Sequence, residues 1–211
     1  MTVQDNCDGK RIFLSFLQQN SKQDVAEKFE LLTKLYFEVN SVINISALRT
    51  ENDVYIKHYL DSIYPYKYFD GSCCDVGCGG GFPSIPLAIV TGLSFIGLDS
   101  VGKKLTLINR CAKELELNNI SAVHARAEDI AKQGKRFDTV SARAVSDVNK
   151  SLMYCAPLAR RGGKIILYKT QNDDRANTST ENKMNVRLVK TEDYTLFSTD
   201  IKRRLFIYEK L

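Results

Sequence analysis

Residues 75–89, DVGCGGGFPSIPLAI, constrain the fold of this chain more than any other segment. Three alternating glycines, Gly77, Gly79 and Gly81, follow an apolar stretch and precede a predicted helix. A loop between a buried strand and a helix lets a ligand touch its backbone only where side chains are absent, which glycine permits. The amides at the start of the helix then face the ligand. The segment therefore predicts a nucleotide-like cofactor at the edge of a parallel sheet.

The spacing of the glycines indicates which cofactor is bound. Dinucleotide-binding loops have the spacing G-x-G-x-x-G, whereas this loop has G-x-G-x-G and follows Asp75. The shorter spacing resembles the first motif of S-adenosylmethionine (AdoMet) methyltransferases. A carboxylate such as Asp75 attracts the cationic AdoMet, whereas it would repel a pyrophosphate. Asp99 ends the next predicted strand, where it can accept hydrogen bonds from both ribose hydroxyls. The alternative is that Asp99 caps the helix that follows.

Hydrophobic periodicity divides the chain near residue 70. Before that point, apolar residues recur at intervals of three and four, which predicts helices over residues 24–39 and 53–69. After it, strands and helices alternate, which favours an α/β fold. The predicted strands are residues 72–76, 93–98, 122–125, 139–141 and 164–168, with closing strands at 186–189 and 204–208. Residues 171–185 are polar and are predicted to form a mobile loop.

We therefore expect a Rossmann-like, mostly parallel sheet whose last strand is antiparallel, the fold of class I AdoMet-dependent methyltransferases. Residues 1–70 would form an N-terminal helical extension packed on the core. Residues 71–211 would form the methyltransferase domain, and the two parts together would make one compact unit. The length of 211 residues suits a single such unit.

Composition excludes several other classes of protein. Six cysteines without a signal-peptide pattern predict reduced thiols and a cytoplasmic location. Cys74 and Cys78 are too poorly partnered by the two histidines of the chain to form a zinc site, so no metal is expected. Residues 76–98 carry no charge, yet six glycines and two prolines there argue against a membrane span.

The positive charge of the chain is concentrated in its last third. Residues 1–140 contain 16 Lys and Arg against 17 Asp and Glu, whereas residues 141–211 contain 14 against 8. A concentrated basic surface indicates contact with a polyanion, most often a nucleic acid. The alternative is a solvated basic surface without a partner.

Five segments together resemble the RsmG family, also called GidB, of bacterial methyltransferases that modify N7 of a guanine in the decoding region of 16S ribosomal RNA. The resemblance spans about residue 25 to the end of the chain. It is carried by NISALRTENDVYIKHYLDSI (44–63), DVGCGGGFPSIPLAI (75–89), LDSVGKK (98–104), RAEDI (126–130) and VSARAVSDVN (140–149). It implies a cytoplasmic enzyme whose cofactor is AdoMet and whose partner is the small ribosomal subunit.

The resemblance also implies the residues of the site. AdoMet would contact Gly77 and Phe82 in the loop, Ala127 and Glu128 beside the adenine, and Arg143 at the end of the fourth strand. Asp75, Gly79 and Asp99 join this set on the arguments from charge and spacing given above. The chain reads S-A-R-A where the family usually has S-R-A, so the register of Arg143 is open by one residue.

Methylation of guanine N7 requires little chemistry from the protein. The neutral base already has a lone pair on N7, so alignment with the methyl group suffices and no general base is assigned. Arg143 is the predicted catalytic residue, since it can bind a phosphate, guanine O6 or the carboxylate of AdoMet. The alternative for Arg143 is an ion pair with Asp147 or Glu128. The residues predicted to contact RNA are Arg143, Lys169, Arg203 and Arg204.

Three other functions remain open at this point. An NAD-binding oxidoreductase would use a similar strand, loop and acid, although the glycine spacing argues against it. A ribosome-binding protein without catalysis would keep the fold, and a small-molecule methyltransferase would keep the cofactor site but leave the basic C-terminal third unexplained. We expect a monomer. His58 is expected to pack between helices, and the alternative is that it orients Asp61 or the loop before it.

Overall fold

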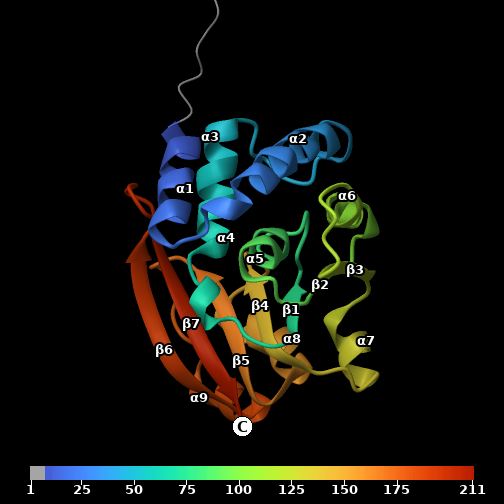
Figure 1. The fold of residues 1–211 in the computed structure, drawn as a ribbon. Coiled ribbons are helices and arrows are strands. Elements are labelled where there is room, and N and C mark those ends of the chain that lie inside the picture. Colours follow the sequence, from blue (N-terminus) through green and yellow to red (C-terminus); the bar gives the residue numbers. More distant parts are fainter. Residues whose placement is uncertain (1–7) are drawn as a thin grey trace, which may run out of the picture.

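The structure is a computed structural model that describes residues 8–211, in which helices cover both faces of one sheet (Figure 1). In these residues the sheet has seven strands in the order β3-β2-β1-β4-β5-β7-β6. Strands β1 to β5 pair in parallel, and β7 runs antiparallel to both β5 and β6. The strands are β1 (Cys73–Val76), β2 (Phe95–Asp99), β3 (Ile120–His124), β4 (Phe137–Arg143), β5 (Ala159–Lys169), β6 (Val186–Thr195) and β7 (Lys202–Lys210). The predicted fold class is confirmed.

The N-terminal part is helical, as predicted. Its longest helix, α2, continues four residues beyond the predicted end at residue 39, up to Ile43, where Asn44 adopts a left-handed conformation. The next helix has a π-helical middle and ends at Ile63 rather than at residue 69. The elements are α1 (Asp8–Gln19), η1 (Gln23–Val25), α2 (Ala26–Ile43), α3 (Glu51–Asp53), η2 (Val54–Leu60), α4 (Asp61–Ile63) and η3 (Tyr66–Tyr68), of which η2 is the π-helical part.

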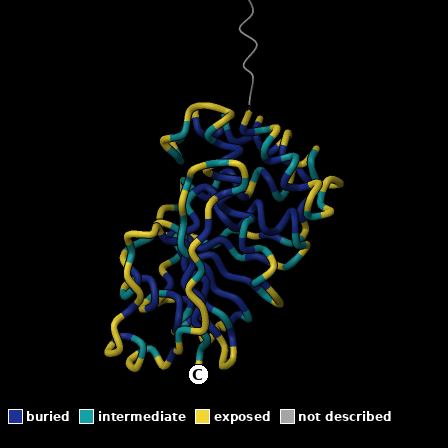
Figure 2. The backbone as a smooth tube through the Cα atoms, turned by 90° about the vertical axis from the view of Figure 1, so that its left-hand side faces the viewer, coloured by how far each residue is buried: buried dark blue, intermediate teal, exposed yellow. Residues whose placement is uncertain are grey.

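Two layers of helices enclose the sheet. One buried apolar cluster joins the N-terminal helices to α5 (Ser84–Thr91), η4 (Gly102–Leu105) and α6 (Thr106–Glu114). A second cluster lies on the other face with α7 (Ala127–Lys132), α8 (Val148–Cys155), η5 (Ala156–Leu158) and α9 (Thr178–Met184). Ile166 of β5 belongs to the first cluster and its neighbours Ile165 and Leu167 to the second, because successive strand residues face opposite sides. Figure 2 shows the buried segments, in dark blue, gathered in the interior of the molecule.

The prediction of a mobile loop over residues 171–185 is wrong in its second half. Helix α9 forms there because Asn177 caps it, with the side-chain oxygen accepting a hydrogen bond from the backbone N–H of Thr180 at 2.8 Å. Thr180 is buried, and α9 belongs to the layer that also contains α8. The segment is too polar for its apolar periodicity to show this helix.

Candidate functional site

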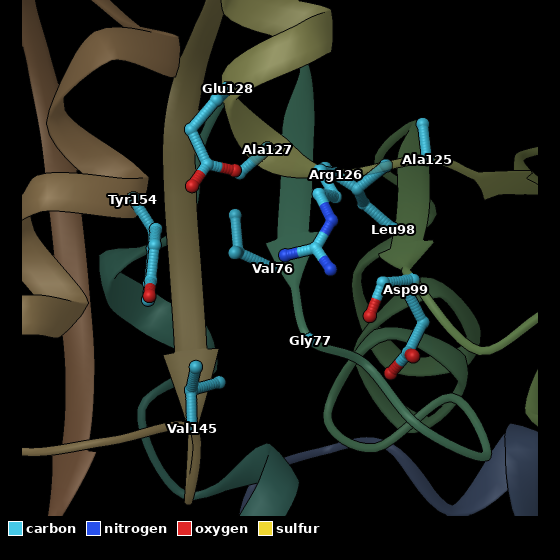
Figure 3. A pocket seen from close by; sticks show the side chains of 11 residues that line it. Val76, Gly77, Leu98, Asp99, Ala125, Arg126, Ala127, Glu128, Val145 and Tyr154 are labelled. Atoms are coloured by element: carbon cyan, nitrogen blue, oxygen red, sulfur yellow. The ribbon is translucent and has the colours of Figure 1, made fainter.

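A cavity of about 260 Å³ lies at the carboxyl ends of β1, β2 and β3 (Figure 3). This is the edge at which parallel α/β sheets bind their ligands. Figure 3 shows the side chain of Arg126 extending across the cavity, between Val76 and Asp99. The lining residues are Val76, Gly77, Leu98, Asp99, Ser100, Ala125, Arg126, Ala127, Glu128, Val145 and Tyr154. We call this space the first cavity.

The glycine loop is held against this cavity by Asp99. One carboxylate oxygen of Asp99 accepts a hydrogen bond from the backbone N–H of Gly79 at 2.9 Å, and the other accepts from Val101 at 2.8 Å. Gly77 has a φ of +67° and Gly79 a φ of +55°, values that favour glycine. A Cβ on Gly77 would lie 2.7 Å from the side chain of Val145, whereas a Cβ on Gly79 would meet no atom within 4 Å. The loop is thus packed on one side and open on the other.

Asp75 lies below the loop and does not line the first cavity. Its side chain is fully buried and accepts hydrogen bonds from the backbone N–H of Ser84 at 3.2 Å and from the hydroxyl of Ser141 at 3.1 Å. Burial raises the pKa of Asp75 to about 7, although both serine hydrogen bonds act in the opposite direction. Asp75 therefore joins the start of α5 to β4.

A second, larger cavity of about 580 Å³ adjoins the first, and Val145 lines both. Its walls come from the N-terminal helices and the connector between α2 and α3, from the turn after β4, from the end of β5 and the residues that follow it, and from β7. They are Ser46, Leu48, Lys57, His58, Asp61, Arg143, Ala144, Val145, Ser146, Tyr168, Lys169, Thr170, Asp173 and Arg203. We call this space the second cavity.

The guanidinium of Arg143 is fixed in the second cavity by groups from the N-terminal helices. Its Nη1 donates to the carbonyl oxygen of Lys57 at 3.0 Å and to the carboxylate of Asp61 at 3.3 Å, and its Nη2 donates to Nδ1 of His58 at 3.0 Å. Asp61 also pairs with Nε of Arg203 at 3.2 Å. Arg143 therefore pairs with neither Asp147 nor Glu128, the alternative partners expected from the sequence.

His58 must be neutral to accept this hydrogen bond. Burial, and secondly the charge of Arg143, lower the pKa of His58 to about 3. Its other ring nitrogen lies 2.9 Å from the hydroxyl of Ser46, and the ring stacks on Phe82 with centroids 4.1 Å apart and planes 2° apart. His58 thus packs between elements, as predicted, and in addition orients Arg143. Phe82 is buried under the imidazole and does not line the first cavity.

The π-helical segment η2 contributes to this arrangement. Lys57 and His58 lie within it, and the backbone N–H of Asp61, at its end, donates to the carbonyl oxygen of Ile56, five residues earlier. π-Helical turns inside α-helices occur frequently at functional sites. Lys57, His58 and Asp61 all line the second cavity.

The structure gathers some of the predicted site residues and separates others. Gly77, Asp99, Ala127 and Glu128 line the first cavity, and Arg143, Lys169 and Arg203 line the second. Arg204 lines neither, because its guanidinium is bound to both carboxylate oxygens of Asp193, at 2.6 and 2.7 Å.

Sequence reasoning missed several wall residues of the first cavity. Arg126 directly precedes Ala127 near the end of β3, and this position was a signal that could have identified it. Val145 follows β4 in the same way. Tyr154 carries no such signal, because its place on the wall depends on how α8 packs against the sheet.

Within the described part of the chain, no three His, Cys, Asp or Glu side chains come together as a metal site would require. The helices of residues 8–211 include none with the length and apolar character needed to cross a bilayer.

Known proteins resemble this chain in sequence and in fold. The family model of rRNA small subunit methyltransferase G, GidB, matches residues 25–206. Ribosomal RNA small subunit methyltransferase G of Lactobacillus helveticus is 36% identical in an alignment that covers 88% of this chain and 82% of the relative. Its counterpart in Staphylococcus aureus is 34% identical over 87% of this chain and 81% of the relative.

Solved structures share the fold. Magnesium protoporphyrin IX methyltransferase of Synechocystis PCC 6803, solved with bound SAH, has a TM-score of 0.56 at 20% identity and covers 83% of this chain and 94% of its own. TehB of Haemophilus influenzae has a TM-score of 0.52 at 16% identity, over 72% of this chain and 62% of its own. At these identities the likeness shows the fold alone.

Proposed function

The chain belongs to the rRNA small subunit methyltransferase G family, and from this membership we infer that it transfers a methyl group from AdoMet to 16S ribosomal RNA. We further propose that the acceptor is N7 of a guanine in the decoding region. The observation that carries the proposal is the pair of adjoining cavities, one beside the glycine loop and one beside the fixed guanidinium of Arg143. Such a pair suits a reaction between two bound molecules.

The first cavity suits AdoMet by its place beside the glycine loop and by the acceptor groups of Asp99. Gly77 lines the cavity and brings the backbone of the glycine loop to its wall. Asp99 uses one lone pair on each carboxylate oxygen within the protein, and a carboxylate can accept about four hydrogen bonds, so it keeps capacity for the ribose hydroxyls. Ala127 and Glu128 would lie beside the adenine. When bound, AdoMet supplies an electrophilic methyl group.

The residues of the second cavity would hold the base. A guanidinium has five N–H donors, and the bonds of Arg143 to the protein leave some of them for guanine O6 or a phosphate. Because neutral N7 needs no proton removed, the contribution of these residues is orientation, which is worth roughly 7–11 kcal/mol in well-aligned reactions. Lys169 and Arg203 add positive charge to the same walls.

We also propose the setting in which the protein works. Its partner would be the small ribosomal subunit, it would act as a monomer in the cytoplasm, and residues 71–211 would be the methyltransferase domain with residues 1–70 as its helical extension. The family assignment supports the ribosomal partner. Both sequence relatives described above are named ribosomal RNA methyltransferases, which favours neither the oxidoreductase nor the small-molecule methyltransferase.

The test is to incubate the purified protein with labelled AdoMet and unmethylated small subunits, and to identify the product by nucleoside mass spectrometry. We expect 7-methylguanosine. Arg143→Ala should lose methylation and keep the fold, because the side chain would hold the base and belongs to neither apolar cluster. Arg160→Ala, which removes an ion pair with Asp138 outside both cavities, should behave like the wild type. Label in another nucleoside, or an active Arg143→Ala variant, would contradict the proposal.

A further inference from the structure

The turn of residues 144–146, between β4 and α8, separates the two cavities. Val145 is the residue of this turn that lines both of them. Its side chain also packs on the loop, since a Cβ on Gly77 would approach it to 2.7 Å. A displacement of the turn would therefore change the shape of both cavities and the contact with the glycine loop at once.

The backbone of this turn is strained. Ala144 has a φ of +54°, in the left-handed region that residues with a Cβ avoid. Strained residues of this kind persist only where their surroundings hold them, and they concentrate at functional sites. The turn therefore needs a group that keeps it in place.

Lys169, at the end of β5, is that group. Its ammonium donates to the carbonyl oxygen of Ser146 and to the hydroxyl of Ser151, the latter at 3.3 Å. Ser151 in turn donates to the carbonyl oxygens of Ser146 at 3.3 Å and Asp147 at 2.8 Å. The side chain of Lys169 is buried, and burial lowers its pKa. A lysine that serves only to attract RNA would gain nothing from burial of its side chain and from hydrogen bonds to the turn.

We propose that Lys169 is a positioning residue: it holds the strained turn, and through Val145 it sets the boundary between the cofactor and the base. This role replaces the RNA contact that the sequence suggested for Lys169. It rests on the proposed function, because the two occupants of the cavities come from there.

The test compares Lys169→Met with wild type in steady-state methylation of small subunits. We expect kcat to fall about 100-fold, as misplacement by an ångström can cause, with the KM for subunits within about twofold of wild type. The salt dependence of subunit binding should not change, whereas loss of a phosphate contact would reduce its slope by about one. Lys164→Met is the matched control, because Lys164 lies on the same strand but pairs with Asp70 outside both cavities.

A second variant tests the turn itself. Glycine adopts a φ of +54° without strain, so Ala144→Gly added to Lys169→Met should restore kcat by about tenfold. Circular dichroism would check that each variant is folded. A wild-type kcat in Lys169→Met, a loss confined to KM with a reduced salt slope, or a defect that Ala144→Gly does not lessen would overturn the proposal. If the proposed function is wrong, the wild-type protein itself will not produce 7-methylguanosine. That result is obtained before any variant is compared, so the two failures can be told apart.

Discussion

Asp75 is a buried carboxyl group whose effect on the protein depends on pH. In the folded state its pKa is about 7, against an ordinary value of 3.8, because burial disfavours the charged form. Between these two values the folded protein keeps a proton on Asp75 that the unfolded chain has lost. The contribution of Asp75 to stability is therefore fully present below about pH 3.8 and decreases as the pH rises towards 7.

Replacing Asp75 with asparagine should remove this dependence. The amide side chain cannot ionise, so the unfolding free energy of Asp75→Asn relative to wild type should increase between pH 4 and pH 7 by up to about 1.4 kcal/mol per pH unit. Urea unfolding at several pH values in this range measures the difference. A difference that is constant across the range would mean that Asp75 is ionised in the folded protein at every pH tested.

Residues next to strand ends could be found from the sequence, but their long-range partners could not. Gly77 and Asp99 follow local patterns, Ala127 was implied by the family resemblance, and all three line the first cavity. The sequence did not indicate that the side chain of Asp75 points into the core, because a carboxylate at the end of a strand can face either a ligand or the core. Arg143 was identified without its partners, since His58 lies 85 residues away and only folding brings the two together.

At the scale of elements, the helix predicted over residues 53–69 shows what periodicity cannot reveal. An apolar repeat of three and four predicts a helix, and a helix forms over most of residues 53–69. The same repeat does not indicate the π-helical part Val54–Leu60. A π-helix depends on hydrogen bonds between residues five apart, instead of the four of an α-helix. This part carries Lys57 and His58 to the second cavity.

Helix α9 supplies a prediction at the same scale. Asn177→Ala removes the cap of α9 and should lower the unfolding free energy by about 1 kcal/mol, with methylation unchanged. Asn182→Ala is the control, because Asn182 is exposed within the same helix and its side chain caps nothing. Urea unfolding at constant pH would compare the two. Equal stability of both variants would show that the Asn177 cap does not stabilise α9.

At the scale of the whole molecule, cofactor binding should be coupled to global stability. A ligand that binds only the folded state at 100 times its Kd adds about 2.7 kcal/mol, which for a chain of this length raises the Tm by roughly 5–10 °C. We expect this shift with AdoMet and none with NAD in a thermal unfolding assay. An equal response to NAD would favour the oxidoreductase instead.

Two glycine variants would test whether the rise in Tm comes from AdoMet bound at the glycine loop. Gly77 and Gly134 both have positive φ, so alanine strains the backbone at either position. Alanine at Gly77 also collides with Val145, whereas at Gly134 it meets no atom within 4 Å. Gly134→Ala should therefore be less stable but keep the AdoMet shift, and Gly77→Ala should lose it. Retention of the full shift in Gly77→Ala would remove the glycine loop from the cofactor site.

The hydrogen bonds of Arg143 have a consequence for how this activity can be lost. They come from Lys57, His58 and Asp61 of the N-terminal helices, and Asp61 is shared with Arg203 of β7. Substitutions in two stretches far from Arg143 in the sequence, at His58 or Asp61 and at Arg203, can thus disturb one guanidinium while the first cavity stays intact. Many different substitutions should therefore inactivate this enzyme, and many of the inactive variants should remain folded and able to bind AdoMet.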